Sequence, residues 1–177
     1  MRYFNLSAQE YLSMETLDSF SEWLGELEAS DDYGRINLAS PGGNVEIAMC
    51  MIDMINQSNK IKEVYVYAEC CSAGLFFITD CWCEVHICDG AYSIFHAPAR
   101  TLNLRELNNK SSMIHALNKF DEKRDYDEKT RYESIGLTKQ EIDTIYDMKD
   151  IFLDSSRLNE IRQCCLKNIP ESVKENW

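Results

Sequence analysis

The sequence predicts an α/β domain built on a mainly parallel sheet, and three observations indicate it. Strand-like and helix-like stretches alternate over the first half of the chain. The run VYVYA at 64–68 is β-branched and aromatic, as in a strand that is covered on both faces of its sheet. The chain has 177 residues, of which 45% are apolar and 27% charged, so it fits one globular domain and excludes global disorder.

The residue pattern in the first half of the chain predicts two helices and two strands. Leucine and phenylalanine at helical spacing predict a helix over 15–28. RINLA at 35–39 predicts a strand, which the Ser-Pro-Gly-Gly sequence at 40–43 ends. Apolar residues recur at helical spacing over 45–56 and predict a second helix, and the strand at 64–68 follows it.

The second half begins with an apolar run that predicts a buried helix over 74–81. Further expected strands cover 85–88, 92–96 and 151–153. After Pro98 the pattern becomes helical, and ten of the thirteen residues over 121–133 are charged, which predicts a solvated helix face. A capping box at 138–141 predicts the start of a short helix before the last strand.

Charge and composition exclude several classes of protein. The formal net charge is −12, which disfavours binding to the phosphate backbone of nucleic acids. The longest apolar run, 75–78, is far shorter than the about 20 residues that span a membrane. The first residues carry no signal-peptide pattern, so we expect a cytoplasmic protein.

Eight cysteines raise the question of a metal site or of disulfides. Without a signal peptide, reduced and buried thiols are expected. Zinc is the alternative at Cys81, Cys83, His86 and Cys88. Strand alternation sends Cys83 to one face and His86 and Cys88 to the other, and the C-x-C spacing is not the usual knuckle, so core thiols and no metal are expected.

Two strand-to-helix turns carry residues that suit catalysis. The turn at 40–45 (SPGGNV) holds two adjacent glycines, which let the main chain offer N–H groups to an anion or an oxyanion. The turn at 69–74 (ECCSAG) carries Ser72 at the carboxyl end of a strand, where α/β domains place their sites. The alternatives are an ordinary tight turn and a serine that caps a helix. The pattern around Ser72 is C-x-S-x-G and differs from the G-x-S-x-G of the hydrolase elbow.

A nucleophilic serine needs a general base, and histidine is the residue that most often serves. Of the three histidines, His86 lies inside an expected strand and His115 on an expected solvated helix. His96 ends a β run just before Ala97-Pro98, so it lies at a strand end as Ser72 does. His96 is therefore the candidate base, with a purely structural role as the alternative.

Taken in order, these motifs resemble the Clp protease proteolytic subunit family (ClpP). The strand and turn INLASPGGNV at 36–45 are similar to the family's S-P-G-G-x-V turn, and CCSAGL at 70–75 stands where the family has its nucleophile turn. SIFHAP at 93–98 matches the strand that ends in the family's histidine. KDIFL at 149–153 occupies the place of its acidic residue, and the resemblance runs from about residue 2 to about residue 161.

The resemblance implies a serine-type endopeptidase with a catalytic triad. Ser72 is then the nucleophile, His96 the general base and Asp150 the residue that orients the imidazole. Asp147, three residues earlier, is the alternative third member. The N–H groups of Gly43 and Ala73 would hold the oxyanion, and the substrate strand would lie beside three further residues, Asn44, Val45 and Ala97.

The resemblance also implies the ClpP/crotonase-like β-β-α superhelix with a long handle helix. Residues 1–177 would form one peptidase domain, with a head at about 1–98 and 150–177 and a handle at about 99–149. Family members are homo-oligomers of heptameric rings, often stacked, that enclose peptides or unfolded protein, and no cofactor is expected. In the family a segment before the first strand helps to dock an ATP-driven unfoldase. Here the matching strand begins almost at residue 1, which argues against an unfoldase partner.

Four alternatives stand beside the active peptidase. One, a signal peptide peptidase-like Ser/Lys enzyme, is disfavoured because it would need a membrane anchor and a second domain. A virus-type capsid maturation peptidase can share this fold. A catalytically silent ClpP-like subunit would have a structural or regulatory role, although such subunits commonly lose a triad member. A crotonase-type acyl-CoA enzyme would share the fold but would not need a serine and a histidine in these turns.

Overall fold

The computed structural model describes residues 1–96 and 128–174 and shows an α/β fold. The strands are β1 (Arg2–Leu6), β2 (Gly34–Ser40), β3 (Ile61–Cys70), β4 (Glu84–Ile87), β5 (Tyr92–Phe95) and β6 (Ile151–Asp154). The α-helices are α1 (Met14–Glu28), α2 (Val45–Gln57), α3 (Leu75–Asp80), α5 (Lys139–Tyr146), α6 (Ser155–Cys165) and α7 (Glu171–Lys174). Two 3-10 turns, η1 (Ser72–Gly74) and η2 (Leu166–Asn168), and a helical stretch at 128–134 complete the set. Most of the expected handle, and Ala97 with it, lies outside the described residues.

The sheet is mixed, with one strand that changes neighbours. Its order is β1-β2-β3-β5-β6, and β4 pairs with the first half of β3. All described pairs are parallel except β5 with β6. Along β3, the segment from Glu63 to Val66 pairs with β4, and Glu69 pairs with Tyr92 of β5. This change brings the carboxyl ends of β2, β3 and β5 to one edge of the sheet.

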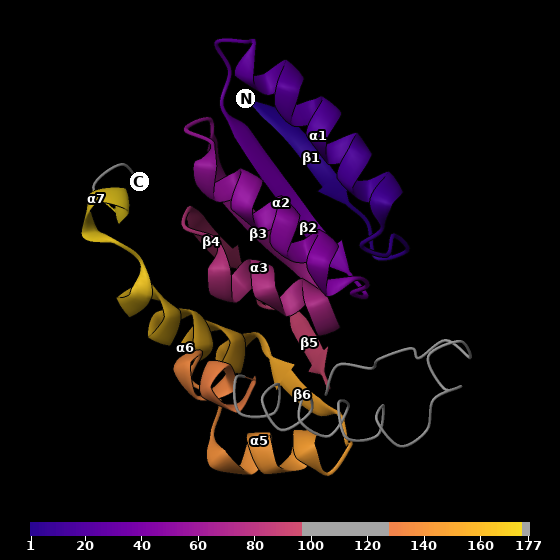
Figure 1. Cartoon of the computed structure of the whole chain (residues 1–177), viewed down its shortest axis with the longest axis vertical. Coiled ribbons are helices and arrows are strands. Elements are labelled where there is room, and N and C mark those ends of the chain that lie inside the picture. Colours follow the sequence, from indigo (N-terminus) through magenta and orange to yellow (C-terminus); the bar gives the residue numbers. More distant parts are fainter. Residues whose placement is uncertain (97–127, 175–177) are drawn as a thin grey trace, which may run out of the picture.

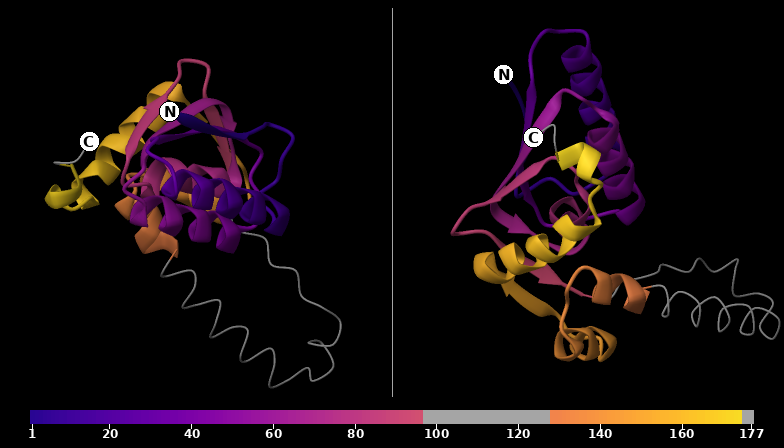
Figure 2. Two further views of the ribbon diagram at one scale, coloured as in Figure 1. Left: turned by 90° about the horizontal axis from the view of Figure 1, so that it is seen from above. Right: turned by 90° about the vertical axis from the view of Figure 1, so that its left-hand side faces the viewer.

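The core lies between the sheet and the helices α1, α2 and α3, which lie side by side on one face of the strands (Figures 1 and 2). Phe20 of α1, Ile52 of α2 and Phe77 of α3 are almost completely buried there. Apolar stripes at helical spacing therefore have the role that the sequence predicted for them. In the described part of the chain, no helix combines the length and the apolar composition of a membrane span.

The prediction that the strand at 64–68 is covered on both faces is wrong. Val64 and Val66 are buried under the helices, but Tyr65 is half-buried and Tyr67 is 44% exposed on the opposite face. On that face the Arg35 guanidinium lies 3.3 Å from the centroid of the Tyr65 ring, and the His86 ring stacks on Tyr65 at 4.2 Å. Ring stacking and cation–π contacts replace a covering layer for these tyrosines, so their apolar character did not indicate burial.

A bidentate ion pair between Arg157 and Glu141 holds helix α5 against α6. Nε and Nη2 of Arg157 each donate to the Glu141 carboxylate at 2.8 Å, and Nη2 also donates to the Gly136 carbonyl. Glu141 completes the predicted capping box with Thr138 at the start of α5. The hydrogen bonds from Arg157 lower the pKa of Glu141 from 4.5 to about 2.

We expect the Arg157→Met protein to unfold about 3–6 °C below wild type at pH 7, because the half-buried carboxylate loses its partner. A depressed carboxyl pKa stabilises the fold above the ordinary value of 4.5, and this contribution disappears as pH falls toward about 2. The difference in Tm should therefore narrow from pH 5 to pH 2 in circular-dichroism melts. Lys174→Met, which breaks the exposed pair with Glu171, is the control and should have little effect at any pH. If the Tm of Arg157→Met lies as far below that of wild type at pH 2 as at pH 7, the ion pair with Glu141 is not the cause of the lower stability.

Candidate active site

The two sequence-predicted turns lie against each other at the edge of the sheet. Ser40 at the end of β2 is in register with Cys70 at the end of β3, and the Cys71 N–H donates to the Ser40 carbonyl at 2.9 Å. A Cβ added to Gly42 would lie 2.7 Å from Cβ of Ser72, and the φ of Gly42 is +102°. Only glycine at position 42 lets the first turn approach Ser72 so closely.

Ser72 has a backbone conformation that is uncommon for a residue with a side chain. Its φ is +49°, in the left-handed region. Ser72 does not cap a helix, because Cys71 precedes η1 as the cap residue and no side chain caps this turn. The strained, sharp turn lifts Ser72 out of β3 at the start of η1. Such strain concentrates at active sites, so the conformation favours the chemical interpretation of Ser72 over the capping one.

A cavity of about 310 Å³ contains both Ser72 and His96. His96 follows Phe95, the last residue of β5, as the sequence predicted. The remaining lining residues are Val45, Glu46, Ala73, Phe76, Phe95, Glu128, Arg131 and Tyr132. The structure therefore brings the expected nucleophile and base to one cavity. The Ser72 hydroxyl has no hydrogen-bond partner among residues 1–96 and 128–174, so no such bond joins it to His96 here.

The two candidate acids differ in their position relative to His96. Strands β5 and β6 are antiparallel, and Phe95 lies opposite Ile151. Continued by one residue beyond the strand ends, this register would place His96 across from Asp150. Asp147 instead follows α5 and forms an exposed ion pair with Lys149 at 3.3 Å. The register favours Asp150, whose exposed carboxylate has no hydrogen-bond partner within the described ranges.

Two backbone N–H groups near Ser72 are free to donate hydrogen bonds to a developing oxyanion. Leu12 bonds to both neighbours of Gly43: its N–H donates to the Gly42 carbonyl, and its carbonyl accepts from the Asn44 N–H, both at 2.9 Å. Gly43 itself, with φ of +143°, keeps its N–H unpaired among the residues that the structure describes. The Ala73 N–H, in the first turn of η1, is likewise unpaired in the described part. These are the two donors that the sequence predicted for an oxyanion.

The residues expected beside a substrate strand have different roles in the structure. Val45 is 38% exposed and lines the cavity. The Asn44 side chain caps α2, because its Oδ1 accepts from the N–H groups of Glu46 and Ile47. Asn44 thus fixes the helix that follows the glycine turn, and its backbone is already paired: its N–H donates to the Leu12 carbonyl and its carbonyl accepts from the Ala48 N–H. In this structure Asn44 therefore offers no free main-chain group to a substrate strand.

Sequence reasoning missed three contributions to this site. The Cys71 Sγ accepts the Ile94 N–H at 3.2 Å, so a thiol ties the Ser72 turn to the strand that carries His96. Arg131 and Tyr132 come from the segment expected to be a solvated helix face, and this expectation is wrong for Tyr132, which is 3% exposed and packs edge-to-face on Phe95. The sequence did carry a signal for the burial of Tyr132, because it is an aromatic residue among charged neighbours.

Five of the eight cysteines are buried, as expected for core thiols, but Cys50 is exposed and Cys88 and Cys164 are half-buried. Cys70 and Cys71 are buried, and burial raises the pKa of both thiols. His86 stacks on Tyr65 and lies 3.5 Å from Glu84. No group of three or more histidine, cysteine, aspartate or glutamate side chains in the described ranges is arranged to hold a metal ion.

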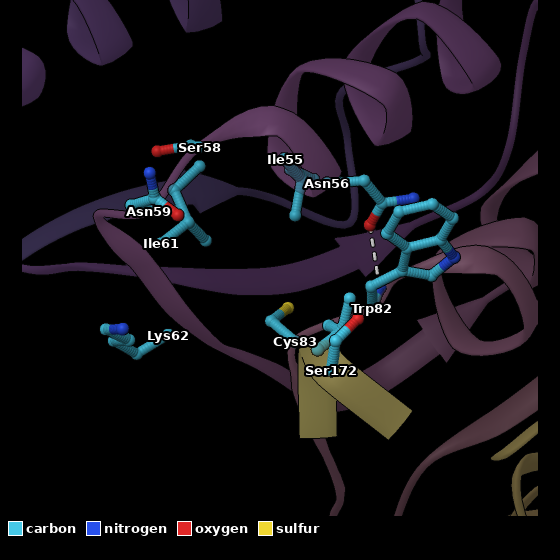
Figure 3. A pocket seen from close by; sticks show the side chains of 10 residues that line it. Ile55, Asn56, Ser58, Asn59, Ile61, Lys62, Trp82, Cys83 and Ser172 are labelled. Carbon is cyan, nitrogen blue, oxygen red and sulfur yellow. Dashed lines mark hydrogen bonds between the residues drawn. The ribbon is translucent and has the colours of Figure 1, made fainter. Parts of the chain in front are cut away.

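A second hollow, shown in Figure 3, has about 130 Å³ and lies between the end of α2, the start of β3 and Trp82. The Asn56 amide, which lines it, has a structural role: it accepts from the Trp82 N–H at 2.7 Å (Figure 3) and donates to the Asp80 carbonyl at 3.0 Å. No titratable pair comparable to Ser72 and His96 lines it. The cavity at Ser72 is therefore the candidate active site.

Comparison of the sequence with models of known protein families and with curated proteins found no match.

Proposed function

We propose that this chain is a serine endopeptidase that hydrolyses peptides or unfolded protein with Ser72, His96 and Asp150. The observation that carries the proposal is the position of Ser72: a serine at positive φ, after a parallel strand, in one cavity with a histidine at the end of a neighbouring strand. The ordered motifs similar to Clp protease proteolytic subunits support the same conclusion. The proposed fold is accordingly the ClpP/crotonase-like superhelix with a handle helix.

In the proposed mechanism His96 transfers protons, Ser72 attacks the substrate, and backbone N–H groups stabilise the oxyanion. The neutral imidazole of His96 accepts the Ser72 proton while Oγ attacks the peptide carbonyl carbon. The Gly43 and Ala73 N–H groups stabilise the resulting oxyanion. His96 then gives its proton to the leaving amine, and water hydrolyses the acyl-serine by the same route. Asp150 holds the imidazole in the correct tautomer and stabilises its protonated form.

The hydrogen bonds of the triad must form when the site is completed. Catalytic hydrogen bonds are often long or absent in a free enzyme and shorten when substrate binds. Exposed apolar side chains surround the strand ends that carry His96 and Asp150: Ile94 and Phe152, which pair across β5 and β6, are 38% and 67% exposed, and Met148 is 81% exposed. We propose that neighbouring copies of the chain cover this surface in a closed homo-oligomer, which would fix Asp150 against His96.

One observation favours a second candidate, a catalytically silent subunit of the same fold. The Ser72 hydroxyl lacks a hydrogen bond to any described residue, as a silent site would. This candidate predicts an assembled protein that does not react at Ser72.

A serine-directed fluorophosphonate separates the two candidates. We expect the native protein, in its assembled state, to be labelled at Ser72, as mass spectrometry of the peptide that contains it would show. Light scattering after size exclusion establishes the assembly state of the same sample. An assembled protein that remains unlabelled at Ser72 across pH 6 to 9 would contradict the active enzyme and favour the silent subunit.

A further inference from the structure

The cavity beside Ser72 has an aromatic wall. Phe76, Phe95 and Tyr132 line it, and each is less than 10% exposed. Their rings meet edge-to-face, with centroids 6.1 Å apart for Phe76 and Phe95 and 5.5 Å apart for Phe95 and Tyr132. A rigid wall of this kind suits the methylene stem of a long side chain.

One ring of this aromatic wall is already in contact with a cationic side chain, Arg131. The Arg131 guanidinium lies over the face of Phe76, 4.1 Å from the ring centroid. Its charge is matched within the protein, because Nη2 forms an ion pair with the Asp80 carboxylate at 3.1 Å. Arg131 therefore leaves little positive charge for an incoming group.

The other charged residues that line the cavity are acidic. Glu46 is exposed in the first turn of α2, and its carboxylate has no ion pair or hydrogen bond with a described residue. Glu128, at the start of the stretch 128–134, also lines the cavity. The whole chain carries a net charge of −12, which favours the approach of cations over that of anions.

From this arrangement we infer that the cavity receives a basic side chain, lysine or arginine, from the residue next to the scissile bond. The inference rests on the proposed peptidase function and names its substrate class. The stem packs on Val45 and on the edges of Phe95 and Tyr132, beside the Phe76 face that Arg131 covers, and the cationic head lies at the carboxylate of Glu46. The carboxylates of Glu46 and Glu128 would repel an acidic substrate side chain from the cavity.

Matched peptide amides test the inference, one with lysine and one with norleucine before a fluorogenic leaving group. Norleucine has nearly the same stem without the charge. We expect kcat/KM to be about 3–10-fold higher for lysine at low salt, and the ratio to approach one in 0.5 M NaCl. Glu46→Gln should lower the ratio, whereas Glu22→Gln, which removes an exposed charge on α1, should leave it unchanged. A norleucine rate equal to or above the lysine rate in wild type would overturn the inference.

A binding experiment separates this inference from the peptidase proposal. Fluorescence anisotropy with the Ser72→Ala protein measures the affinity for labelled nonapeptides that carry lysine or norleucine at the centre. Tighter binding of the lysine peptide, lost in a Ser72→Ala/Glu46→Gln double variant, supports the basic pocket even if wild type cleaves nothing. Equal binding of both peptides refutes the basic pocket, whatever the protein cleaves.

Discussion

The Ser72→Ala protein is expected to lose peptide hydrolysis by at least about 10⁴-fold while it keeps its fold and assembly. The substitution removes only the hydroxyl group. Because this hydroxyl forms no hydrogen bond with any described residue, its loss leaves no buried group unsatisfied. Initial rates with a fluorogenic peptide, compared with wild type at equal concentration of assembled protein, measure the effect. Circular dichroism and light scattering verify that fold and assembly are retained.

Two further variants make this result specific. Ser72→Gly also removes the hydroxyl but suits the φ of +49° better than serine, so it should be equally inactive and at least as stable as wild type. Ser19→Ala removes an exposed serine on α1, far along the chain from the site, and should leave the rate unchanged. If Ser72→Ala keeps a tenth or more of the wild-type rate, Ser72 is not the nucleophile.

The sequence predicted the central part of the site because local chemistry determines it. Glycines at 42 and 43 and the serine at 72 mark turns at the carboxyl ends of strands, and parallel strands bring such ends to one edge. The position of His96 at the end of β5 followed from the β pattern that precedes it. Their common cavity is a consequence of strand order, which the ordered motifs indicated.

The parts that were not predicted depend on contacts between distant residues. Helix α6 was missed because Arg162 interrupts its apolar stripe. The structure buries that guanidinium, which is 3% exposed, and satisfies it with the carbonyls of Ile78, Cys81 and Cys83 around the end of α3. Arg131 was likewise expected to be solvated, and only its long-range contacts with Phe76 and Asp80 reveal its place at the cavity.

The two candidate acids can be distinguished by a pair of matched substitutions. Asp150→Asn should reduce kcat by roughly 10³–10⁴-fold, because a neutral amide neither holds the imidazole in the right tautomer nor stabilises its protonated form. Asp147→Asn removes the same charge three residues away and should change kcat by less than about twofold, since its partner is the exposed Lys149. Steady-state kinetics with one fluorogenic peptide measures both variants.

The reason for expecting such different effects is the register of β5 and β6. Phe95 is opposite Ile151, so His96 and Asp150 are the residues that directly adjoin this last pair, while Asp147 lies further from the strand, at the end of α5. Ser72 in the Asp150→Asn protein should still react with fluorophosphonate, although more slowly, because the nucleophile and the oxyanion donors are intact. A large loss in Asp147→Asn together with a small one in Asp150→Asn would mean that the turn before β6 rearranges in the active assembly, with Met148 at φ of +59° as the residue most able to change conformation.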